Sequence, residues 1–452
     1  MSAPGLTYAE ALEAIESRGR YGIRLGLGRV RALLRELDDP DRSVRGALVA
    51  GTNGKGSVIA LAGSALRAAG YRIGETPKPH LVTYRERIVV DGRPIDPAAF
   101  ASLVAEVLPV ADRVGRRRGA PTEFELLTGV MFLHFARSRL DLALVEVGLG
   151  GRLDATNAWD GGVAVLTNVG LDHTAQLGPT IQAIAREKVQ IVKRGDGAVT
   201  GAEGEALAIM QRRCARLGVP LAVRSPARVL GWDRDSLRVE LSEGRACDVG
   251  LRGRHQAANV AVADGLLDAL EVAGLATVPA TARSLGYATA RWPGRLELVE
   301  VGGREVLLDG AHNEDGAHAL ARALEDLRPF LRPGPLTVVW ASMADKDVAA
   351  TVAAMVASSA LDGATVVCTA VDAPRALEPL ALAEAWRAGA ALAGRSLAVD
   401  AAATPDAALD RVLGGRGVPG TGPIVIAGSL YLVGQARARL VDDPLLRDPV
   451  AT

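Results

Sequence analysis

The feature that most constrains this chain is the stretch ALVAGTNGKGSVIALAGSALRAAGY at residues 47–71. A short apolar run, typical of a buried strand, leads into a turn that contains Gly51, Gly54 and Gly56, and the pattern of an amphipathic helix follows. Glycines let the backbone turn tightly, so that several N–H groups can point at one anion, and the N-terminus of a helix also favours negative charge. The stretch therefore predicts a phosphate-binding loop between a strand and a helix.

The loop is shorter than the common phosphate-binding pattern G-x-x-x-x-G-K-[ST]. Only two residues separate Gly51 from Gly54, and Gly56 stands between Lys55 and Ser57. The residue types still suit a nucleotide, because a lysine ammonium pairs with phosphate oxygens and a serine hydroxyl can bind Mg²⁺. The candidate phosphate contacts are Thr52, Asn53, Gly54, Lys55, Gly56 and Ser57.

Lysine is scarce in this chain. Lysine and arginine together number 52, but the five lysines are only Lys55, Lys78, Lys188, Lys193 and Lys346. Arginine serves wherever any cation would do, so the lysine positions are candidates for chemistry that arginine cannot perform. Such chemistry needs a compact ammonium group, or an amine whose pKa can be shifted.

Strand-like and helix-like segments alternate, which predicts an α/β fold with mostly parallel sheets covered by helices. In the first part of the chain, helices are expected at residues 8–17, 28–37, 97–117 and 122–138, and strands at 46–50, 141–147 and 162–168. Thr122 and Glu125 predict a capping box for the fourth helix, and Asp91-Gly92 predicts a hairpin turn. A second alternating series begins near residue 298 and predicts a second α/β domain.

Charge and composition exclude several classes of protein. The formal net charge of +0 argues against an electrostatic nucleic-acid binder. The three cysteines are widely scattered and fit neither a metal site nor a disulfide framework. No apolar run reaches the roughly 18 residues of a membrane span, and the first residues do not resemble a signal peptide. We expect a cytoplasmic protein that binds neither nucleic acid nor membranes.

Polar side chains also follow two other predicted strands. Glu146 ends the strand DLALVE, and Asn168, Asp172 and His173 follow the strand GVAVLT. Ligands of open parallel sheets bind at the carboxyl ends of the strands, so Glu146 and His173 could converge there. The carboxylate of Glu146 suits Mg²⁺, which prefers oxygen ligands. Lys188 lies on a helix farther along, where a solvated charge is the simplest interpretation.

Nine short motifs occur in one order along the chain: GTNGKGS, EVGLGGRLDATN, TNVGLDHT, AREK, GRHQAANVAVA, RWPGRLE, DGAHN, ADKD and GSLYLVG. Together they resemble the folylpolyglutamate synthase/dihydrofolate synthase family, a branch of the Mur-ligase superfamily. The resemblance implies an N-terminal P-loop ATPase domain at residues 1–294 and a C-terminal Rossmann-like glutamate ligase domain at 295–452, with Pro293-Gly294 as the candidate linker. It also implies an ATP-dependent ligase that adds L-glutamate to dihydropteroate or a folate through an acyl phosphate, giving ADP and phosphate.

The resemblance further implies roles for residues around the phosphates. Lys55 would contact the β- and γ-phosphates, and Ser57 and Glu146 would hold Mg²⁺. His173 would hold a second metal ion, and Lys188 would be carbamylated by CO₂, which supplies a carboxylate towards that metal. Lys55, Lys188 and His173 are therefore the candidate catalytic residues. A guanidinium cannot provide the neutral amine that carbamylation needs, so the scarcity of lysine supports this role for Lys188.

Four more nucleotide contacts follow from the same resemblance. Asn259 would contact the adenine end of ATP, and Arg295 would contact the phosphates. Asp309 and His312 would reach ATP from the second domain, and the enzyme would act as a monomer.

Two departures from the family pattern stand near the expected substrates. The segment RLGLGRV has Arg24 and Gly28 where the family pattern DLGLERV has acids. In TPKPHL, Lys78 replaces the serine of the family's TSPHL, which lies near Mg²⁺. An ammonium group has only donors and cannot bind Mg²⁺. We therefore expect Lys78 to contact the γ-phosphate or acyl phosphate directly, with water in the missing ligand position.

Two other functions compete with this interpretation. One is a different Mur-type ligase, such as an enzyme that joins an amino acid to a UDP-linked muramyl sugar. The other is a nucleotide-binding regulator related to GTPases, although the chain has no N-K-x-D motif for guanine. The sequence leaves open whether a folate ligase of this kind makes dihydrofolate, extends folates, or does both.

Overall fold

The computed structural model describes residues 5–21, 24–414 and 422–449. Its internal contacts divide the chain into two units. The first unit consists of Met1–Ala227, Ala258–Thr289 and Pro444–Thr452, and the second consists of Arg228–Ala257 and Ala290–Asp443. The two-part α/β fold class is confirmed, while the domain boundary between residues 294 and 295 stays a prediction.

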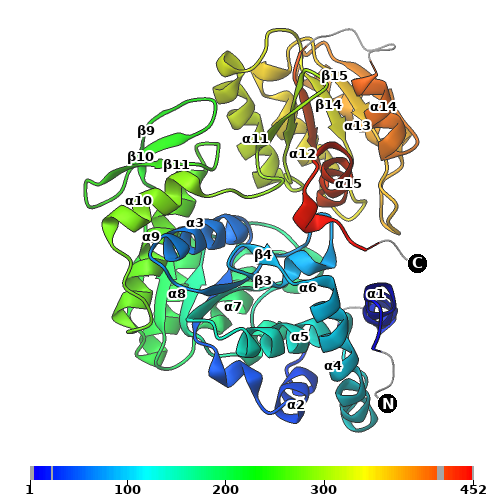
Figure 1. Cartoon of the computed structure of the whole chain (residues 1–452). Helices are drawn as coiled ribbons and strands as arrows, with labels where there is room; N and C mark the ends of the chain where they lie inside the picture. Colours follow the sequence, from blue (N-terminus) through cyan, green and yellow to red (C-terminus); the bar gives the residue numbers. More distant parts are fainter. Residues whose placement is uncertain (1–4, 22–23, 415–421, 450–452) are drawn as a thin grey trace. The chain divides into compact units, whose positions relative to one another are not determined.

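The first unit contains an eight-stranded sheet in the order β4-β3-β2-β5-β1-β6-β7-β8. Figure 1 labels the hairpin strands β3 and β4 of this sheet. The strands of the sheet are β1 (Gly46–Ala50), β2 (Ile73–Thr76), β3 (Val89–Val90), β4 (Arg93–Pro94), β5 (Leu142–Glu146), β6 (Gly162–Leu166), β7 (Gly197–Thr200) and β8 (Leu221–Val223). The six strands from β2 to β8 in this order run parallel, and the β3–β4 hairpin adds an antiparallel edge. The central strands β5, β1 and β6 are buried along their whole length.

Helices cover both faces of this sheet. One face carries α1 (Tyr8–Glu16), α2 (Gly28–Glu36), α4 (Pro97–Arg118), α5 (Glu123–Arg137) and α8 (Gly204–Leu217), whose apolar sides share one core with the sheet. The opposite face carries α3 (Lys55–Ala68), α9 (Gln256–Val272) and α10 (Ala280–Thr289). There Gly286 of α10 lies so close to Ala65 of α3 that a Cβ would be 2.3 Å from its Cα. The short helices α6 (Thr174–Leu177) and α7 (Ile181–Lys188) follow β6.

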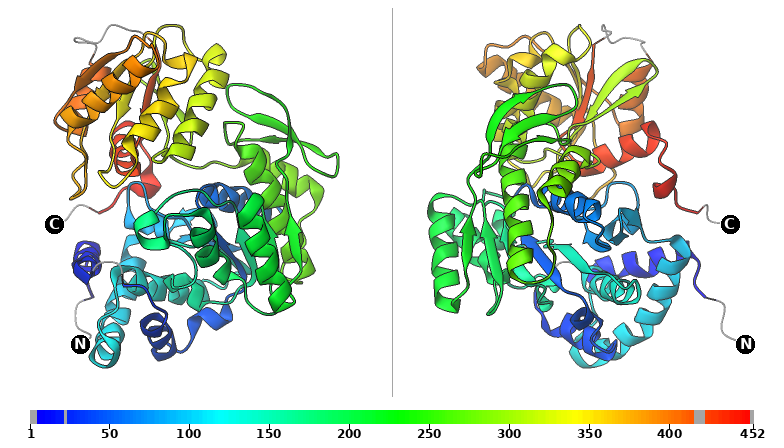
Figure 2. Two further views of the ribbon diagram at one scale, coloured as in Figure 1. Left: turned by 180° about the vertical axis from the view of Figure 1, so that it is seen from behind. Right: turned by 60° about the vertical axis from the view of Figure 1, so that its left-hand side comes forward.

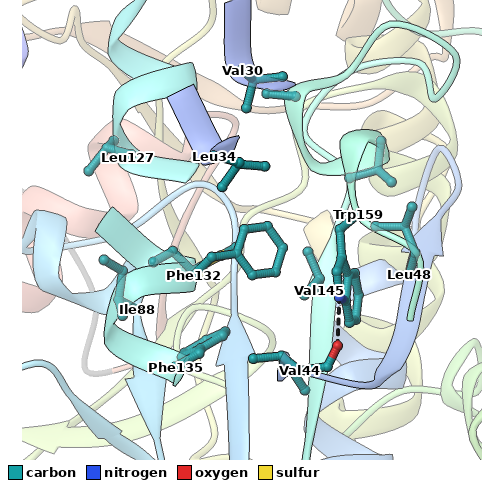
Figure 3. Packing of buried hydrophobic residues seen from close by; sticks show 14 of the residues in the cluster. Val30, Leu34, Val44, Leu48, Ile88, Leu127, Phe132, Phe135, Val145 and Trp159 are labelled. Carbon is teal, nitrogen blue, oxygen red and sulfur yellow. Dashed lines mark hydrogen bonds between the residues drawn. The ribbon is translucent and has the colours of Figure 1, made fainter. Parts of the chain in front are cut away.

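Trp159 is one of the largest buried side chains of this core (Figure 3). Its ring lies 5.6 Å from that of Phe132, and its indole N–H donates a 2.9 Å hydrogen bond to the carbonyl of Val44. A buried indole needs such an acceptor to offset the loss of water. The contact fixes the segment before β6 against the segment before β1.

The second unit contains a six-stranded sheet in the order β12-β13-β17-β14-β15-β16. Its strands are β12 (Glu297–Val301), β13 (Arg304–Leu308), β14 (Thr337–Trp340), β15 (Thr365–Cys368), β16 (Ala398–Ala401) and β17 (Ile424–Ala427), and only β12 is antiparallel to its neighbour. One face packs against α11 (Glu314–Leu327), α12 (Val348–Val356) and α13 (Pro379–Leu392). The helices α14 (Pro405–Leu413) and α15 (Leu430–Leu440) complete the unit (Figure 2).

Two local features that the sequence predicts, a helix capping box and a hairpin turn, are confirmed. Thr122 and Glu125 form the expected capping box, and Asp91 and Gly92 turn the β3–β4 hairpin with φ values of 51° and 75°. The alternation of strands and helices does not predict the antiparallel sheet of β9 (Arg228–Trp232), β10 (Leu237–Glu240) and β11 (Ala246–Val249). In the described part of the chain, no helix is long and apolar enough to cross a membrane.

Replacing Trp159 with alanine should lower the free energy of unfolding by about 3–5 kcal/mol, because a large buried ring is lost and the cavity collapses only in part. Urea denaturation measures the change. The control is Phe330→Ala, which alters a side chain that is 40% exposed and should cost less than about 1 kcal/mol. A Trp159→Ala protein as stable as its parent would contradict the packing described here.

Candidate nucleotide and metal site

The loop after β1 and the segments after β5 and β6 share one edge of the first sheet. β1 lies between β5 and β6 and runs parallel to both. Val49 of β1 is in register with Glu146 of β5, and the amide of Thr167, just after β6, donates to the carbonyl of Ala50. The three strands thus bring the loop, Glu146 and the segment leading to His173 to the edge where ligands bind in such sheets.

Two glycines let the loop approach its neighbours closely. Gly51 has φ +156°, and a Cβ there would lie 1.8 Å from Oγ1 of Thr167. Gly54 has φ +80°, and a Cβ there would lie 2.2 Å from Oδ1 of Asn259 on α9. Only glycine avoids both clashes, which explains these two positions of the motif. The contact also places the predicted adenine ligand Asn259 beside the loop, while its contact with adenine stays a prediction.

Residues after β6 hold the loop in place. The amide of Asn53 donates to Oδ1 of Asn168 at 2.9 Å, and the amide of Thr52 donates to the Asn168 carbonyl at 3.0 Å. The buried Thr52 hydroxyl lies 3.1 Å from the carbonyl of Gly170 and accepts from the Gly170 amide at 2.9 Å. Thr52 and Asn53 therefore shape the loop in this structure. The sequence marked Asn168 only as a polar strand end, and its role as the support of the loop was missed.

Two ammonium groups meet at one backbone carbonyl. Nζ of Lys55 donates to the carbonyls of Gly51 (3.2 Å) and Thr52 (3.0 Å), and Nζ of Lys188 donates to the same Gly51 carbonyl at 2.8 Å. Burial, and to a smaller extent the charge of Lys55, lowers the pKa of Lys188 to about 7, against the carboxylates of Asp172 and Asp154. Lys188 is thus a buried amine beside the loop and not the solvated charge that its helix suggested.

Glu146 stands next to this pair. Its carboxylate is buried, with Oε1 3.9 Å from Nζ of Lys55 and Oε2 accepting a 3.0 Å hydrogen bond from the amide of Lys78. Its own amide donates to Oγ1 of Thr76 on the neighbouring strand β2. The structure therefore brings three predicted site residues, Lys55, Glu146 and Lys188, to one place.

Lys78 also lies beside Glu146. Its Nζ donates to the carbonyl of Glu146 at 2.6 Å and lies 4.4 Å from the centre of the Phe124 ring. Burial lowers the pKa of Lys78 to about 8, and the carboxylates of Asp154 and Glu146 oppose that shift. These contacts tie Lys78 to the end of β5. The expected contact with the γ-phosphate or acyl phosphate stays a prediction.

Asp154 is a further buried carboxylate of the site that the sequence analysis did not single out. Its Oδ2 accepts from the amides of Gly148 (3.0 Å) and Leu149 (2.9 Å), which closes the glycine-rich turn after β5. Its charge raises the pKa of both Lys78 and Lys188. The available signal was its place in the motif GGRLDATN, eight residues beyond Glu146.

The side chains of Ser57 and Glu146 are of the types that bind a divalent cation together with phosphate, and their role as its ligands stays a prediction. In residues 5–21, 24–414 and 422–449, no three His, Cys, Asp or Glu side chains gather closely enough to hold a metal by themselves. Mg²⁺ commonly takes one or two carboxylates together with water and substrate phosphates, so a hydroxyl and a carboxylate beside a phosphate loop suffice. His173 has φ +51°, and its side chain is nearly half exposed beside Asp172. A second metal at His173 stays a prediction.

The remaining predicted ATP contacts lie in the second unit. Asp309 is buried after β13, and its oxygens accept from the amides of Leu296 and Ala311, both at 2.9 Å. Burial raises the pKa of Asp309, and the adjacent guanidinium of Arg295 opposes the shift. Nδ1 of His312 lies 2.8 Å from the carbonyl of Gly310. Arg295, Asp309 and His312 therefore cluster at one strand end, and their contacts with ATP stay predictions.

Like Asp154, His255 was not identified as a candidate site residue from the sequence. Desolvation by the surrounding protein and the nearby charge of Arg295 together lower its pKa, although the residue keeps part of its solvent exposure. It packs against Gly253, where a Cβ would lie 2.6 Å from the ring. Its position inside the motif GRHQAANVAVA was the only signal for it.

Two family models match the chain. The Mur ligase middle domain covers residues 49–267, and the glutamate ligase domain of Mur ligases covers residues 294–430. Among curated relatives, the folylpolyglutamate synthase of Lacticaseibacillus casei is 34% identical over 457 residues, which is 96% of this chain and 99% of that protein.

Solved structures agree in fold over almost the whole chain. Folylpolyglutamate synthase from Mycobacterium tuberculosis, complexed with ADP and AMPPCP, has a TM-score of 0.85 and 32% identity, and the match covers 97% of this chain and all of that one. The bifunctional folylpolyglutamate synthase/dihydrofolate synthase from Yersinia pestis, complexed with AMPPNP and a Mn ion, has a TM-score of 0.79 and 28% identity, covering 97% and 99%. These matches and the site confirm the resemblance: the chain belongs to the folylpolyglutamate synthase/dihydrofolate synthase family of the Mur ligase superfamily.

Proposed function

We propose that this chain uses ATP to join L-glutamate to dihydropteroate, to folates, or to both, with release of ADP and phosphate. The proposal rests on one observation: the ammonium groups of Lys55 and Lys188 both donate hydrogen bonds to the Gly51 carbonyl, beside Glu146. The group sits on a phosphate-binding loop, in a chain that matches a folylpolyglutamate synthase over 96% of its length.

The chemistry explains why so much charge is placed here. A carboxylate oxygen is a poor leaving group, so the acceptor carboxylate first attacks the γ-phosphorus of ATP and forms an acyl phosphate while ADP leaves. The amine of glutamate then attacks the acyl carbon and expels phosphate. In the first step one anion attacks another, so alignment and charge neutralisation dominate the barrier. Lys55 supplies a fixed positive charge at the loop for this purpose.

Ser57 and Glu146 would hold the divalent cation. When bound, such a cation neutralises phosphate charge and orients the transferred group. The Mn ion of the Yersinia pestis relative supports a divalent cation at this kind of site. The amide of Lys78 donates to the Glu146 carboxylate and holds it in position, while Oγ1 of Thr76 accepts from the backbone amide of Glu146.

A carbamate on Lys188 is the second part of the proposal. Its pKa of about 7 leaves a large fraction of the amine neutral at physiological pH. The ammonium group first gives a proton to water; the neutral nitrogen then attacks the carbon of CO₂ and gives a second proton to water, so that a carboxylate replaces a buried cation. The carbamate nitrogen keeps one N–H, which suffices for the hydrogen bond to Gly51. This carboxylate would face a second metal ion near His173.

Nucleotide contacts from Asn259 of the first unit and from three residues of the second unit complete the proposal. Asn259 binds the adenine end, Arg295 binds the phosphates, and Asp309 and His312 contact ATP. Arg295 and Asp309 support these roles because they are oppositely charged neighbours at a strand end, and Asp309 is held by two backbone amides.

The function itself is tested by ADP release with L-glutamate, comparing dihydropteroate with tetrahydrofolate as the acceptor. Glutamate-dependent release with either acceptor is expected, and the ratio of the two rates assigns the enzyme to one or both reactions. Turnover with a UDP-linked muramyl acceptor, and with neither folate acceptor, would favour the other Mur-type ligases.

Replacing Glu146 with glutamine should lower kcat at least about 100-fold, because the site loses a negatively charged metal ligand while its shape is kept. It should also weaken Mn²⁺ binding in the presence of ADP about tenfold or more, measured by calorimetry. Glu106→Gln is the control, since Glu106 is an exposed residue paired with Arg137. Normal Mn²⁺ affinity in Glu146→Gln would contradict its role as a ligand.

Replacing Lys188 with arginine should lower the activity at least about 100-fold. It should also abolish the carbamate signal in carbon-13 NMR of protein equilibrated with labelled CO₂. Lys193→Arg is the matched control, because Lys193 is also shielded, with its Nζ bonded to Asn157 and Trp159, but lies outside the site. At fixed dissolved CO₂, the signal in the parent should grow as pH rises through about 7, since the neutral amine dominates above its pKa. A fully active Lys188→Arg protein would rule out the carbamate.

A further inference from the structure

Arg85 is a buried cation that the proposed chemistry does not use. It lies in the 3₁₀ helix η3 (Tyr84–Arg87), and its side chain is only 4% exposed. Its guanidinium donates to Oδ1 of Asp448 (2.9 Å) and to the carbonyls of Ile95 (3.2 Å), Leu445 (2.9 Å) and Arg447 (3.0 Å). Three of these four acceptors belong to residues 444–449, which we call the strap.

The strap follows the second unit in sequence but belongs to the first. It starts with the 3₁₀ helix η8 (Pro444–Leu446), and its contacts are mainly with the first unit. Besides Arg85, Asp448 accepts from the hydroxyl of Thr83 at 2.8 Å and from that of Tyr8 on α1 at 3.1 Å. Removing one member of a buried ion pair leaves the other charge uncompensated, so this anchor is costly to break.

The anchor is connected to the nucleotide site through the loop at residues 77–83. At one end of the loop, the amides of Leu81, Val82 and Thr83 donate to the carboxylate of Glu86 in η3. At the other end, Lys78 donates to Glu146 through both its amide and its ammonium group. Hydrogen bonds therefore run from the strap through η3 and the loop to Glu146.

We propose that the strap holds the 77–83 loop in the position that ligation requires, so that Arg85 and Asp448 are positioning residues for the Lys78–Glu146 contact. The inference rests on the proposed function for its catalytic consequence, but the restraint on the loop is a separate physical claim. Neither residue reaches the loop after β1. Their loss should therefore disturb the transfer of the phosphoryl group more than the binding of ADP.

The chain offers a matched control pair. Asp443 is 28% exposed and pairs with Arg437, which is 6% exposed, much as Asp448 (32%) pairs with Arg85 (4%). Both aspartates stand in the same stretch of sequence, but Asp443 and Arg437 belong to the second unit, where Arg437 also pairs with Glu297. Asp443→Asn thus removes an equivalent charge from an ion pair of the second unit.

The test compares Asp448→Asn with Asp443→Asn in three measurements. For Asp448→Asn, kcat should fall about 10- to 100-fold, because a displacement of about 1 Å in a reacting site costs up to about 100-fold. The dissociation constant of ADP should stay within about twofold of the parent value. Hydrogen exchange at the amides of residues 81–83 should become at least about tenfold faster. Asp443→Asn should leave all three readouts near those of the parent.

A double-mutant cycle separates positioning from general loss of stability. If the strap acts through Lys78, Asp448→Asn should lower kcat further by less than about twofold in a Lys78→Met background, although its effect on Tm is the same in both backgrounds. An equal loss of kcat in both backgrounds would overturn the proposal. Tyr8→Phe removes the hydroxyl that contacts Asp448 and Thr83, each at 3.1 Å, and gives a milder version of the same test if Asp448→Asn does not fold.

The exchange measurement keeps the two proposals distinct. If the parent shows no glutamate-dependent ADP release, the proposed function fails, while faster exchange at residues 81–83 in Asp448→Asn still supports the restraint on the loop. Unchanged exchange in both Asp448→Asn and Tyr8→Phe would overturn the role of the strap, whatever the activity of the parent.

Discussion

The carbonyl of Gly51 accepts hydrogen bonds from the ammonium groups of both Lys55 and Lys188. Two like charges at one acceptor repel, and burial adds the cost of lost hydration. The protein reduces this cost by lowering the pKa of Lys188 to about 7 and by placing Glu146 and Asp154 nearby. The balance favours the arrival of a polyphosphate at the loop, and the carbamate proposed for Lys188 would relieve the same repulsion. The two clustered ammonium groups are thus unfavourable without a ligand, and binding of phosphate to the loop offsets their repulsion.

This arrangement depends on the strand order β5-β1-β6. Each of the three strands is buried, and each ends at the same edge with a different contribution: Glu146, the phosphate loop, and Asn168, which supports the loop. The contacts that hold the loop leave no room for a Cβ at Gly51 or Gly54. The loop geometry is therefore a property of the sheet and α9 together, because a strand–loop–helix unit alone lacks Thr167 and Asn259, which enclose it.

Local features could be predicted from sequence, and contacts between distant segments could not. The capping box at Thr122 and the hairpin turn at Asp91 depend on residues a few positions apart, so their signals survive in a short window. Glu146 and Lys188 lie 42 positions apart and were connected only through the family resemblance. The ion pair of Arg85 and Asp448 joins residues 363 positions apart and leaves no local pattern. Burial likewise escapes a sequence reading, which is why Lys188 looked like a solvated charge on an amphipathic helix.

The small number of lysines in this chain has a physical basis in these contacts. Lys55, Lys78 and Lys188 each place an ammonium group against one or two backbone carbonyls in a confined space. A guanidinium has five N–H donors on a broad plane, so arginine at the same places would need more acceptors and more room. Arg85 shows the contrast, since the strap and Ile95 surround its buried guanidinium with four acceptors. The chain keeps lysine where few acceptors meet a buried charge, and arginine where several segments must be joined at one point.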